Sequence, residues 1–165
     1  MGTPHTADSV DAALLLALNA APDATAVALA ETTGLARNTV RSRQLRYQQE
    51  QSLRSFERRI DPAFLGYPLR AFVVTTVKQR KLSAVGCALA EIPEVLEVQG
   101  LTGVADLLIQ VAARDADDLY RIAGAILNID GVKRTNTGLV MRDLVSYRIT
   151  PLIERSAYRP SSALR

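Results

Sequence analysis

The feature that most constrains this chain is the stretch from Ala28 to Arg43, in which an apolar helical pattern is interrupted by a glycine and resumes with arginines. The stretch reads ALAETTGLARNTVRSR, with Gly34 near its centre. A glycine-containing turn between two short helices is typical of a helix-turn-helix, whose second helix carries donors for base edges and phosphates. The pattern therefore predicts a nucleic-acid-binding unit near the N-terminus.

The distribution of charge supports a nucleic-acid partner. The formal net charge of the chain is only +3, and no lysine or arginine precedes Arg37. Residues 37–59 then carry seven arginines against two glutamates. A local surplus of this kind fits a surface that faces phosphates. An ordinary solvated helix face has the same composition and stays an alternative.

Three helices are expected in the N-terminal part of the chain. Apolar residues repeat with helical spacing over 9–19, Thr25 is suited to cap a second helix that runs to Thr33, and a third helix covers 37–49. Two short helices alone bury too little apolar surface to be stable. We therefore expect the first helix to complete a three-helix core.

Beyond residue 51 the apolar period changes from helical to alternating. We expect a connecting strand over 52–60 and a boundary at 61–68, where Asp61 and Pro62 interrupt the pattern. The elements that follow are expected in the order strand, helix, strand, strand, helix, strand, at 69–77, 82–92, 95–101, 106–113, 117–129 and 132–149, the last as one strand or two. This β-α-β-β-α-β order is the ferredoxin-like plan of the α+β class.

The expected sheet has apolar residues on both faces, since Val73 and Val77 alternate with Phe72 and Val74. Two helices cover only one face, so we expect the other face to pair with a second subunit. The predicted organisation is a helix-turn-helix domain at 1–52, a connecting strand and linker at 53–67, a βαββαβ domain at 68–152 and a tail at 153–165. The tail lacks a packing pattern and is expected to be mobile or an exchanged arm.

Several classes of protein are excluded by what the sequence lacks. It has no apolar run of about eighteen residues that could span a bilayer and no secretory signal, so we expect a cytoplasmic protein without membrane contact. A single cysteine, Cys87, closes no intramolecular disulfide, and a single histidine, His5, leaves no Cys/His zinc site. Neither a nucleophile beside a base, nor paired catalytic carboxylates, nor a metal cluster is recognisable, so we expect no enzyme and no cofactor.

Two further features have a structural explanation. Asp115, Asp117 and Asp118 suggest a metal cluster, but carboxylates at a helix start complement its free N–H groups and its dipole. We therefore interpret them as a helix start. Cys87 has no basic neighbour in its segment, so we expect a buried small apolar residue rather than a redox sensor.

The order and spacing of several short motifs together resemble the Lrp/AsnC (feast/famine) family of bacterial and archaeal transcription regulators, over nearly the whole chain. The residues that carry the resemblance are Asp11 with Leu14 and Leu18, Leu29-Ala30 before Gly34-Leu35, the helix from Arg37 to Arg43, Ile60-Asp61-Pro62 with Leu65-Gly66, Ile92-Pro93-Glu94-Val95, Leu101 to Asp106, and Gly131 to Thr135 with Thr137. The resemblance implies a RAM-type βαββαβ domain for effector binding and oligomerisation. It also implies double-stranded DNA and an amino-acid effector as partners, a homodimer that assembles to an octamer, and a nucleoid-associated location.

The third helix carries the residues expected to bind DNA: Arg37, Asn38, Thr39, Arg41, Ser42, Arg43 and Arg46. Arg37 and Arg41 are four residues apart and share one face of the helix. Arginine suits guanine O6/N7 and asparagine suits adenine N6/N7, which assigns Arg37, Asn38 and Arg41 to base edges. Thr39 and Ser42 are assigned to phosphates, and Val40 is expected to face the helical core.

The same helix departs from the family in two places. Relatives usually have an apolar residue where Gln44 stands, whereas here Leu45 and Tyr47 are the apolar ones, so either Gln44 is partly exposed or the helix is rotated locally. Relatives also commonly have a glycine where Gln51 stands, and a residue with a side chain tolerates a left-handed cap poorly. We therefore expect the helix to run on into Ser52.

A free amino acid is a zwitterion, so its receptor needs an acceptor for the ammonium group and donors for the carboxylate. The segment after residue 100 offers both, because Gly103 lets backbone amides come close and Asp106 can accept from the ammonium group. By resemblance, this hairpin lies where dimers meet. The expected effector residues are Leu101, Thr102, Gly103, Val104 and Asp106, with Thr135 or Thr137 from a neighbouring subunit. The alternative is that Gly103 is simply a turn residue and that Asp106 caps the turn.

The leading interpretation is a sequence-specific transcription regulator whose assembly or DNA affinity responds to amino acids. An architectural protein that wraps or bridges DNA with little sequence preference is the alternative. Salt dependence and the ratio of specific to random affinity separate the two. A sensor that has lost DNA binding also stays open, because of Gln44 and Gln51.

Overall fold

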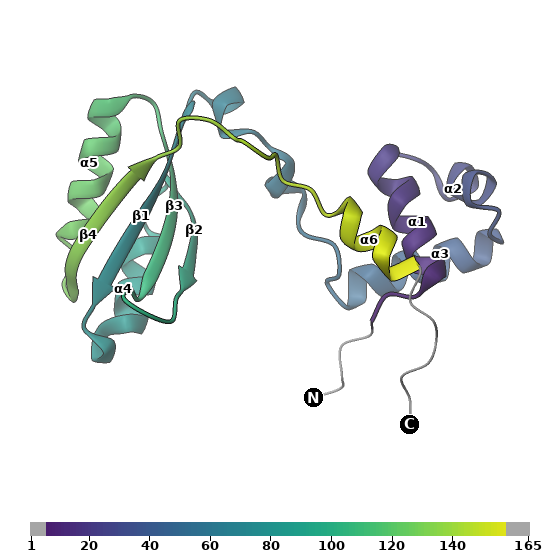
Figure 1. Ribbon diagram of the computed structural model, residues 1–165, viewed down its shortest axis with the longest axis horizontal. Coiled ribbons are helices and arrows are strands. Elements are labelled where there is room, and N and C mark those ends of the chain that lie inside the picture. The colour runs from purple at the N-terminus through teal and green to yellow at the C-terminus, as the bar shows by residue number, and fades with distance from the viewer. Residues whose placement is uncertain (1–5, 158–165) are drawn as a thin grey trace. The chain divides into compact units, whose positions relative to one another are not determined.

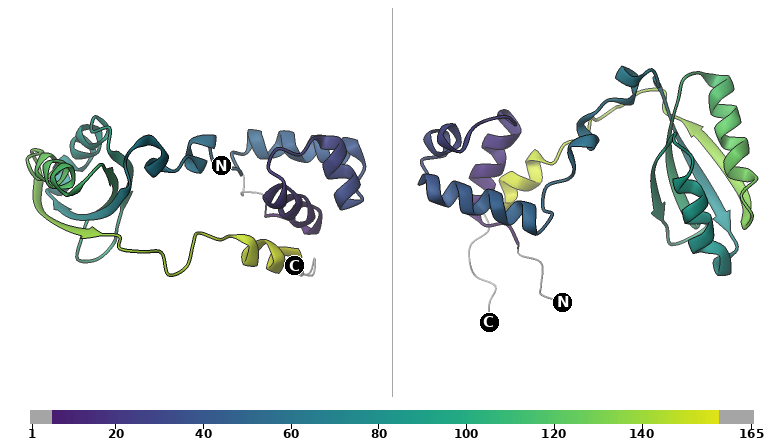
Figure 2. Two further views of the ribbon diagram at one scale, coloured as in Figure 1. Left: turned by 90° about the horizontal axis from the view of Figure 1, so that it is seen from above. Right: turned by 180° about the vertical axis from the view of Figure 1, so that it is seen from behind.

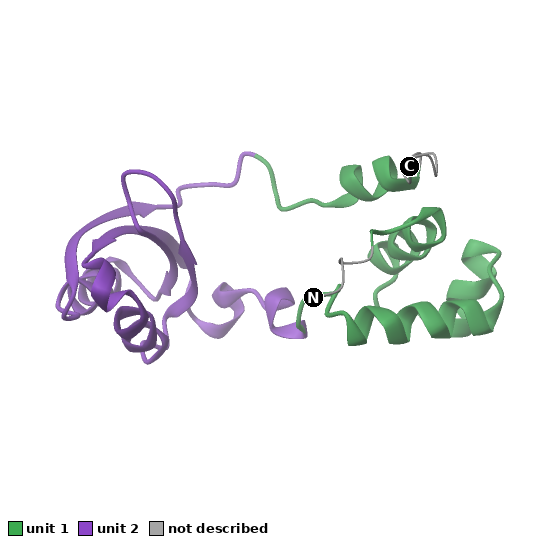
Figure 3. Ribbon diagram, turned by 90° about the horizontal axis from the view of Figure 1, so that it is seen from below, with its two compact units in different colours: residues 1–55, 145–165 green, residues 56–144 purple. Residues whose placement is uncertain are grey.

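The computed structural model describes residues 6–157, so His5 and the end of the expected tail lie outside the described residues (Figure 1). The chain divides into two compact units (Figure 3). Unit 1 comprises the chain up to residue 55 together with the segment from residue 145 onward, and unit 2 comprises residues 56–144. The expected linker thus belongs largely to unit 2, whereas the end of the expected second domain belongs to unit 1.

Unit 1 contains the three predicted helices, α1 (Ser9–Ala20), α2 (Ala26–Thr33) and α3 (Arg37–Gln49), which are confirmed. Asp8 caps α1 by accepting from the Asp11 amide at 2.8 Å, and the Asp11 carboxylate accepts in return from the Asp8 amide at 3.1 Å. Thr25 caps α2, as expected, through the Ala28 amide at 3.2 Å. The helices enclose an apolar core formed by Leu14, Leu29, Ala30, Val40 and Tyr47.

A further helix, α6 (Thr150–Ala157), lies along α1 in unit 1 (Figures 1 and 2). The expected strand up to residue 149 was therefore wrong beyond Leu139, and the expectation of a mobile tail from 153 was wrong over 153–157. Ile153, Ser156 and Ala157 are half-buried and recur at helical spacing, so this segment has a packing face that becomes stable only against α1. The Asn19 side-chain amide donates to the Thr150 hydroxyl at 3.4 Å.

Unit 2 has the predicted α+β architecture. Its antiparallel sheet has the strand order β2-β3-β1-β4, with β1 at Leu69–Val77, β2 at Val95–Gly100, β3 at Leu107–Ala113 and β4 at Val132–Leu139. Both helices, α4 (Leu82–Ala90) and α5 (Ala116–Leu127), lie on one face of the sheet (Figure 2). The core between the helices and the sheet is apolar and fully buried, and includes Val73, Val85, Leu89, Ile109, Ile122 and Ile126.

The expected connecting strand at 52–60 was wrong. Phe56–Arg59 and Pro62–Leu65 are short 3₁₀ helices, and the second is capped by Asp61, whose carboxylate accepts from the Ala63 amide at 3.0 Å. A strand needs a neighbour for its backbone N–H and C=O groups, and the described chain offers none to this segment. For the same reason β4 ends at Leu139, which is paired with Ala71 close to the start of β1.

The two faces of the sheet differ in their cover. Ala71, Val73 and Thr75 of β1 point toward the helices and are buried, whereas Phe72 and Val74 on the other face are exposed. Within residues 6–157 no helix is both long and apolar enough to cross a membrane.

The expected helix start at Asp115 is confirmed. Asp115 caps α5 through the Asp118 amide at 2.8 Å, and Asp118 pairs with Arg114 and Arg121. The expectation that Cys87 is buried was wrong, because its side chain is exposed. Val85 and Leu89 turn to the core at a spacing of four residues, which places Cys87 between them on the opposite side of α4.

Candidate nucleic-acid interface and ligand site

The turn between α2 and α3 depends on one residue, Gly34. Its backbone has φ 71° and ψ 12°, the left-handed conformation in which a helix ends most easily when there is no Cβ. Leu35 is half-buried beside the core of unit 1, and Ala36 is extended before α3 starts. The local sequence thus ends one helix and starts the next within three residues, as the helix-turn-helix interpretation requires.

One face of α3 is exposed from end to end. Arg37, Asn38, Arg41 and Ser42 are all exposed, and they recur at the spacing of three and four residues that aligns side chains along a helix. Val40 is completely buried, which confirms its expected place in the core. Thr39 is half-buried, and its carbonyl accepts from the Ser42 hydroxyl at 2.9 Å. The structure therefore brings Arg37, Asn38 and Arg41 onto one accessible face.

Arg43 and Arg46 turn the other way. Arg43 Nη1 lies 2.9 Å from Asp11 Oδ2 and 2.8 Å from Asp8 Oδ2, and Arg46 Nη2 donates to Asp11 Oδ1 at 2.6 Å. The Tyr47 hydroxyl donates to the same Oδ1 at 2.7 Å. Asp11 itself is only 1% exposed. We call this group of Asp11, Arg43, Arg46 and Tyr47 the Asp11 cluster.

The electrostatics of the Asp11 cluster favour the charged carboxylate. Burial raises the pKa of Asp11, but hydrogen bonds from the Asp8 amide, Tyr47 and Arg43 outweigh it, so the net pKa lies well below its usual value. Burial, followed by the hydrogen bond to Asp11, raises the pKa of Tyr47. The cluster therefore holds an ionised carboxylate of α1 against two arginines and a tyrosine of α3.

This geometry corrects the expected roles of Arg43 and Arg46, whose guanidinium groups fix α3 to α1 rather than face outward. The signal was present in the sequence, because Asp11 stands on the apolar stripe of the first helix, three and seven residues before Leu14 and Leu18. A carboxylate at such a position needs a charged partner, since burying an unpaired charge is very unfavourable.

Both departures from the family pattern in α3 are also resolved. Gln44 is half-buried, and Tyr47 takes the core position at 4% exposure while Leu45 is 55% exposed. The expected extension of α3 into Ser52 was wrong. The helix ends at Gln49, and Gln51 adopts a left-handed backbone with φ 51°, after which the Ser52 amide donates to the Tyr47 carbonyl at 2.9 Å.

Five of the expected effector residues lie in the turn between β2 and β3, at one end of the sheet of unit 2 (Figure 1). They are Leu101, Thr102, Gly103, Val104 and Asp106. Asp106 Oδ2 accepts from the Val77 amide at 2.8 Å, and Oδ1 accepts from the Gln79 side-chain amide at 2.6 Å. The carboxylate thus ties the hairpin to the end of β1, a structural role different from capping the turn at Gly103. A carboxylate has further lone pairs, so these two bonds leave it able to accept from an ammonium group.

The rest of the hairpin is open to solvent. Gly103 has φ 117°, and Leu101, Thr102 and Val104 are exposed. A ligand pocket buries most of its ligand. A pocket at these residues therefore needs atoms beyond this hairpin.

Thr135 and Thr137 lie on β4, opposite Thr75 and Val73 of β1. The carbonyl of Thr75 also accepts from the Asp106 amide at 3.0 Å. Thr135 is therefore separated from Asp106 by two strand spacings, about 10 Å. Between them the Thr75 hydroxyl is completely buried and has no hydrogen-bond partner among residues 6–157.

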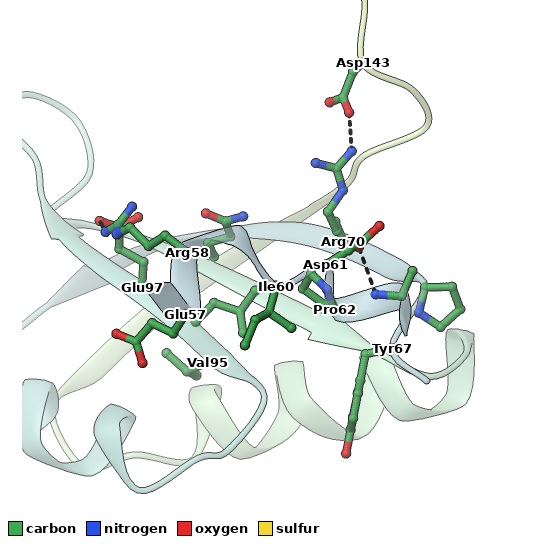
Figure 4. A pocket seen from close by; sticks show the side chains of 14 residues that line it. Glu57, Arg58, Ile60, Asp61, Pro62, Tyr67, Arg70, Val95, Glu97 and Asp143 are labelled. Atoms are coloured by element: carbon green, nitrogen blue, oxygen red, sulfur yellow. Dashed lines mark hydrogen bonds and ion pairs between the residues drawn. The ribbon is translucent and has the colours of Figure 1, made fainter. Parts of the chain in front are cut away.

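A cavity of about 800 Å³ lies at the opposite end of the sheet (Figure 4). It lies between the segment of the two 3₁₀ helices, residues 56–65, and the face of the sheet without helices. Two ion pairs border it, Arg58 with Glu97 and Arg70 with Asp143, each at 2.6 Å. Gln110 and Tyr67 are among the other lining residues, but none of the expected effector residues is. Both arginines that line this cavity are therefore already paired with carboxylates.

The chain is similar to a known protein family and to several curated proteins. The family described as Lrp/AsnC ligand binding domain matches residues 70–150. Among curated proteins, the chain is 34% identical over 141 residues to the HTH-type transcriptional regulator AldR of Mycolicibacterium smegmatis, covering 83% of this chain and 82% of AldR. It is 32% identical over 114 residues to the HTH-type transcriptional regulator FL11 of Pyrococcus horikoshii, covering 69% of this chain and 76% of FL11.

Solved structures agree with these matches. E. coli AsnC superimposes with a TM-score of 0.78 at 24% identity, covering 89% of this chain and all of AsnC, and this shows the shared fold. A feast or famine regulatory protein from M. tuberculosis, in complex with L-methionine, superimposes with a TM-score of 0.75 at 26% identity, covering 86% of this chain and 97% of that protein.

Proposed function

The chain belongs to the Lrp/AsnC family of transcriptional regulators, and from this premise we propose that it binds double-stranded DNA sequence-specifically through α3 and changes its assembly or DNA affinity when an amino acid binds to unit 2. As a member of a family of regulators, it is not an enzyme. A regulator that binds the chromosome acts beside it, so we assign the protein to the nucleoid of the cytoplasm.

The observation that carries the DNA-binding proposal is the exposed face of α3. Arg37, Asn38 and Arg41 stand free on a helix whose rotation is fixed by the Asp11 cluster. Donors on a rigid element can meet base edges without a large loss of conformational freedom. We propose Arg37, Asn38 and Arg41 as the base contacts and Thr39 and Ser42 as phosphate contacts.

For the effector we propose the hairpin between β2 and β3. A solved relative contains L-methionine, which supports an amino acid as the ligand class. In this chain the site would use Asp106 for the ammonium group and amides near Gly103 for the carboxylate. Leu101, Thr102 and Val104 would line it, and Thr135 or Thr137 would come from a neighbouring subunit.

A second copy of this chain is the proposed cover for the open face of the sheet in unit 2. Phe72 and Val74 on that face are exposed, and so are Phe64 and Leu65 of the 3₁₀ segment beside β1. Several large apolar side chains left in water on one unit favour an interaction surface there. We propose a homodimer formed there that assembles further to an octamer through the effector hairpins.

The test is fluorescence-anisotropy binding to the DNA upstream of the gene for this protein and to a random duplex of equal length. Each is measured with and without a pool of the twenty amino acids. Tighter binding to the upstream DNA that shifts with the pool supports the proposal. Equal, salt-sensitive binding to both duplexes that the pool leaves unchanged would contradict it and favour an architectural protein.

A further inference from the structure

Unit 2 carries a second concentration of positive charge that the proposed function does not use. It consists of Lys78, Arg80 and Lys81 after β1 and of Lys133 and Arg134 at the start of β4, and we call it the basic end. The two segments are neighbours, because Thr76 is paired with Arg134 and the Lys78 amide donates to the Gly131 carbonyl at 2.8 Å. All but Lys81 are exposed.

The basic end concentrates positive charge in a unit that is electrically balanced only as a whole. Residues 56–144 contain eleven basic and eleven acidic residues. Arg58, Arg70, Arg114 and Arg121 each pair with a carboxylate. In the basic end only Lys81 does so, with Asp130, and the other four members form no salt bridge with any described carboxylate.

Two of the other cations, Lys78 and Arg80, lie close enough to that pair to act on Asp130. The hydrogen bond from Lys81, followed by its charge and the charges of Lys78 and Arg80, holds the pKa of Asp130 below its usual value. The five cations still leave a positive surplus when Asp130 and the neighbouring Asp106 are both counted against them. Surplus charge at an exposed surface attracts polyanions.

The backbone beneath the basic end is held in place. A Cβ at Gly131 would stand 2.8 Å from the Cβ of Lys81, so the two segments touch closely there. On the other side, Asp106 binds the Val77 amide and the Gln79 side chain. Close packing and hydrogen bonds therefore hold the backbone that carries these cations, beside the proposed effector hairpin.

We propose that the basic end binds the phosphate backbone of DNA without reading its sequence, as a contact separate from α3. The inference rests on the proposed function, because the partner is taken to be the DNA that α3 selects. Lysine and arginine side chains without an accompanying base-reading helix position DNA but do not specify it. The basic end lies at the end of the sheet opposite the start of β1, about 27 Å away at the rise of a strand. The proposal assigns it to DNA that flanks the sequence read by α3.

The test compares the full chain with the double variant Lys133→Gln/Arg134→Gln. A matched control, Arg59→Gln/Arg142→Gln, removes two exposed cations of unit 2 outside the basic end. Binding is measured over a range of salt concentrations to a duplex of about 20 base pairs that holds one operator and to one of about 150 base pairs with the operator at its centre. Sedimentation reports the assembly state of each protein.

We expect the double variant to bind the short duplex like the wild type and the long duplex more weakly. The slope of log K against log salt on the long duplex should fall by about one to two, because up to two phosphate contacts are lost. The control should keep the full slope.

Unchanged binding of the double variant to the long duplex would overturn the inference and leave the proposed function intact. An altered sedimentation pattern would also overturn it, since the surface would then belong to a subunit contact. A wild-type protein that binds neither duplex would contradict the proposed function itself.

Discussion

The two units pair arginines with carboxylates in opposite ways. In unit 1, Asp11 is buried and its partners Arg43 and Arg46 are only 20% and 26% exposed, so the pairs lie largely inside the protein. In unit 2, Asp118 is buried too, but Arg114 and Arg121 are 62% and 52% exposed. Pairs whose cation stays in water contribute little to stability, whereas removing one member of a buried pair leaves an uncompensated charge. Arginine–aspartate pairs therefore orient a helix in unit 1, whereas in unit 2 they lie at the protein surface.

The sharpest test of this difference is Asp11→Asn. Removing the negative charge leaves Arg43 and Arg46 without their common partner, and we expect the free energy of unfolding of unit 1 to fall by roughly 3–5 kcal/mol. Urea unfolding followed by far-UV circular dichroism measures the change. Arg121→Gln in unit 2 is the matched control and should leave the unfolding of that unit almost unchanged. Equal losses in the two variants would show that the contrast between the units is wrong.

The pH dependence of unit 1 follows from the same carboxylate. Because the pKa of Asp11 is lowered in the folded state, its contribution to stability is fully present above the unfolded value, which is about 3.9. That contribution is lost as the pH falls below this value toward the lower folded pKa. Acid titration of the wild type should therefore show unit 1 losing stability below about pH 4. In Asp11→Asn this part of the titration should be absent, and its persistence there would assign the loss to other groups.

Two substitutions in α3 distinguish side chains proposed to contact DNA bases from side chains that hold the helix in place. Arg37→Ala removes an exposed side chain, so we expect operator affinity to fall by roughly 1–3 kcal/mol with no change in thermal stability. Arg46→Ala removes a donor to buried Asp11, and we expect a loss of stability of roughly 1.5–3 kcal/mol instead. Anisotropy titration and thermal denaturation of both variants measure the two effects. If Arg37→Ala lost stability and Arg46→Ala lost only affinity, the assigned roles would be reversed.

Elements whose structure depends on residues nearby in the sequence were predicted correctly, whereas elements that depend on distant residues were not. The helices of the helix-turn-helix and the βαββαβ elements were predicted because each carries its own periodic signal, as in the alternation of Val73 and Val77 with Phe72 and Val74. The exposed face of α3 was predicted in part, since Arg37 and Arg41 share a face by local geometry alone.

The failures concern segments whose structure depends on a distant partner. The segment near Phe56 has strand-like alternation but no neighbouring strand among residues 6–157. Helix α6 is short and packs on α1, far away in sequence. Arg43 and Arg46 were assigned to DNA because nothing within α3 reveals that Asp11, more than thirty residues earlier, takes their charge. The sequence pattern within one helix does not reveal such contacts with distant residues.

Two buried side-chain atoms of unit 2 have no hydrogen-bond partner among residues 6–157, Glu94 Oε2 and, in the apolar core, Thr75 Oγ1. Thr75→Val replaces the unpartnered hydroxyl by a methyl group of the same size, so we expect unit 2 to become more stable by about 1 kcal/mol. Thr76→Val on the neighbouring, half-buried position is the control and should have a smaller effect. Thermal denaturation measures both. A loss of stability in Thr75→Val would mean that the hydroxyl has a partner after all, supplied by a ligand or by a second copy of the chain.

The smallest expected effect concerns the end of α3 in unit 1. Gln51 holds a left-handed backbone with φ 51°, which disfavours a residue with a Cβ by roughly 1–2 kcal/mol, whereas glycine adopts it freely. Glycine also makes the unfolded chain more flexible, so the net gain of Gln51→Gly should be about 0.5–1 kcal/mol. The same exchange inside the helix, Gln49→Gly, should instead destabilise unit 1 by up to about 1 kcal/mol. Opposite signs for two identical substitutions two residues apart would show that backbone conformation, and not the glutamine side chain, decides the effect. A loss in Gln51→Gly would show that the Gln51 side chain contributes more than its strained backbone costs.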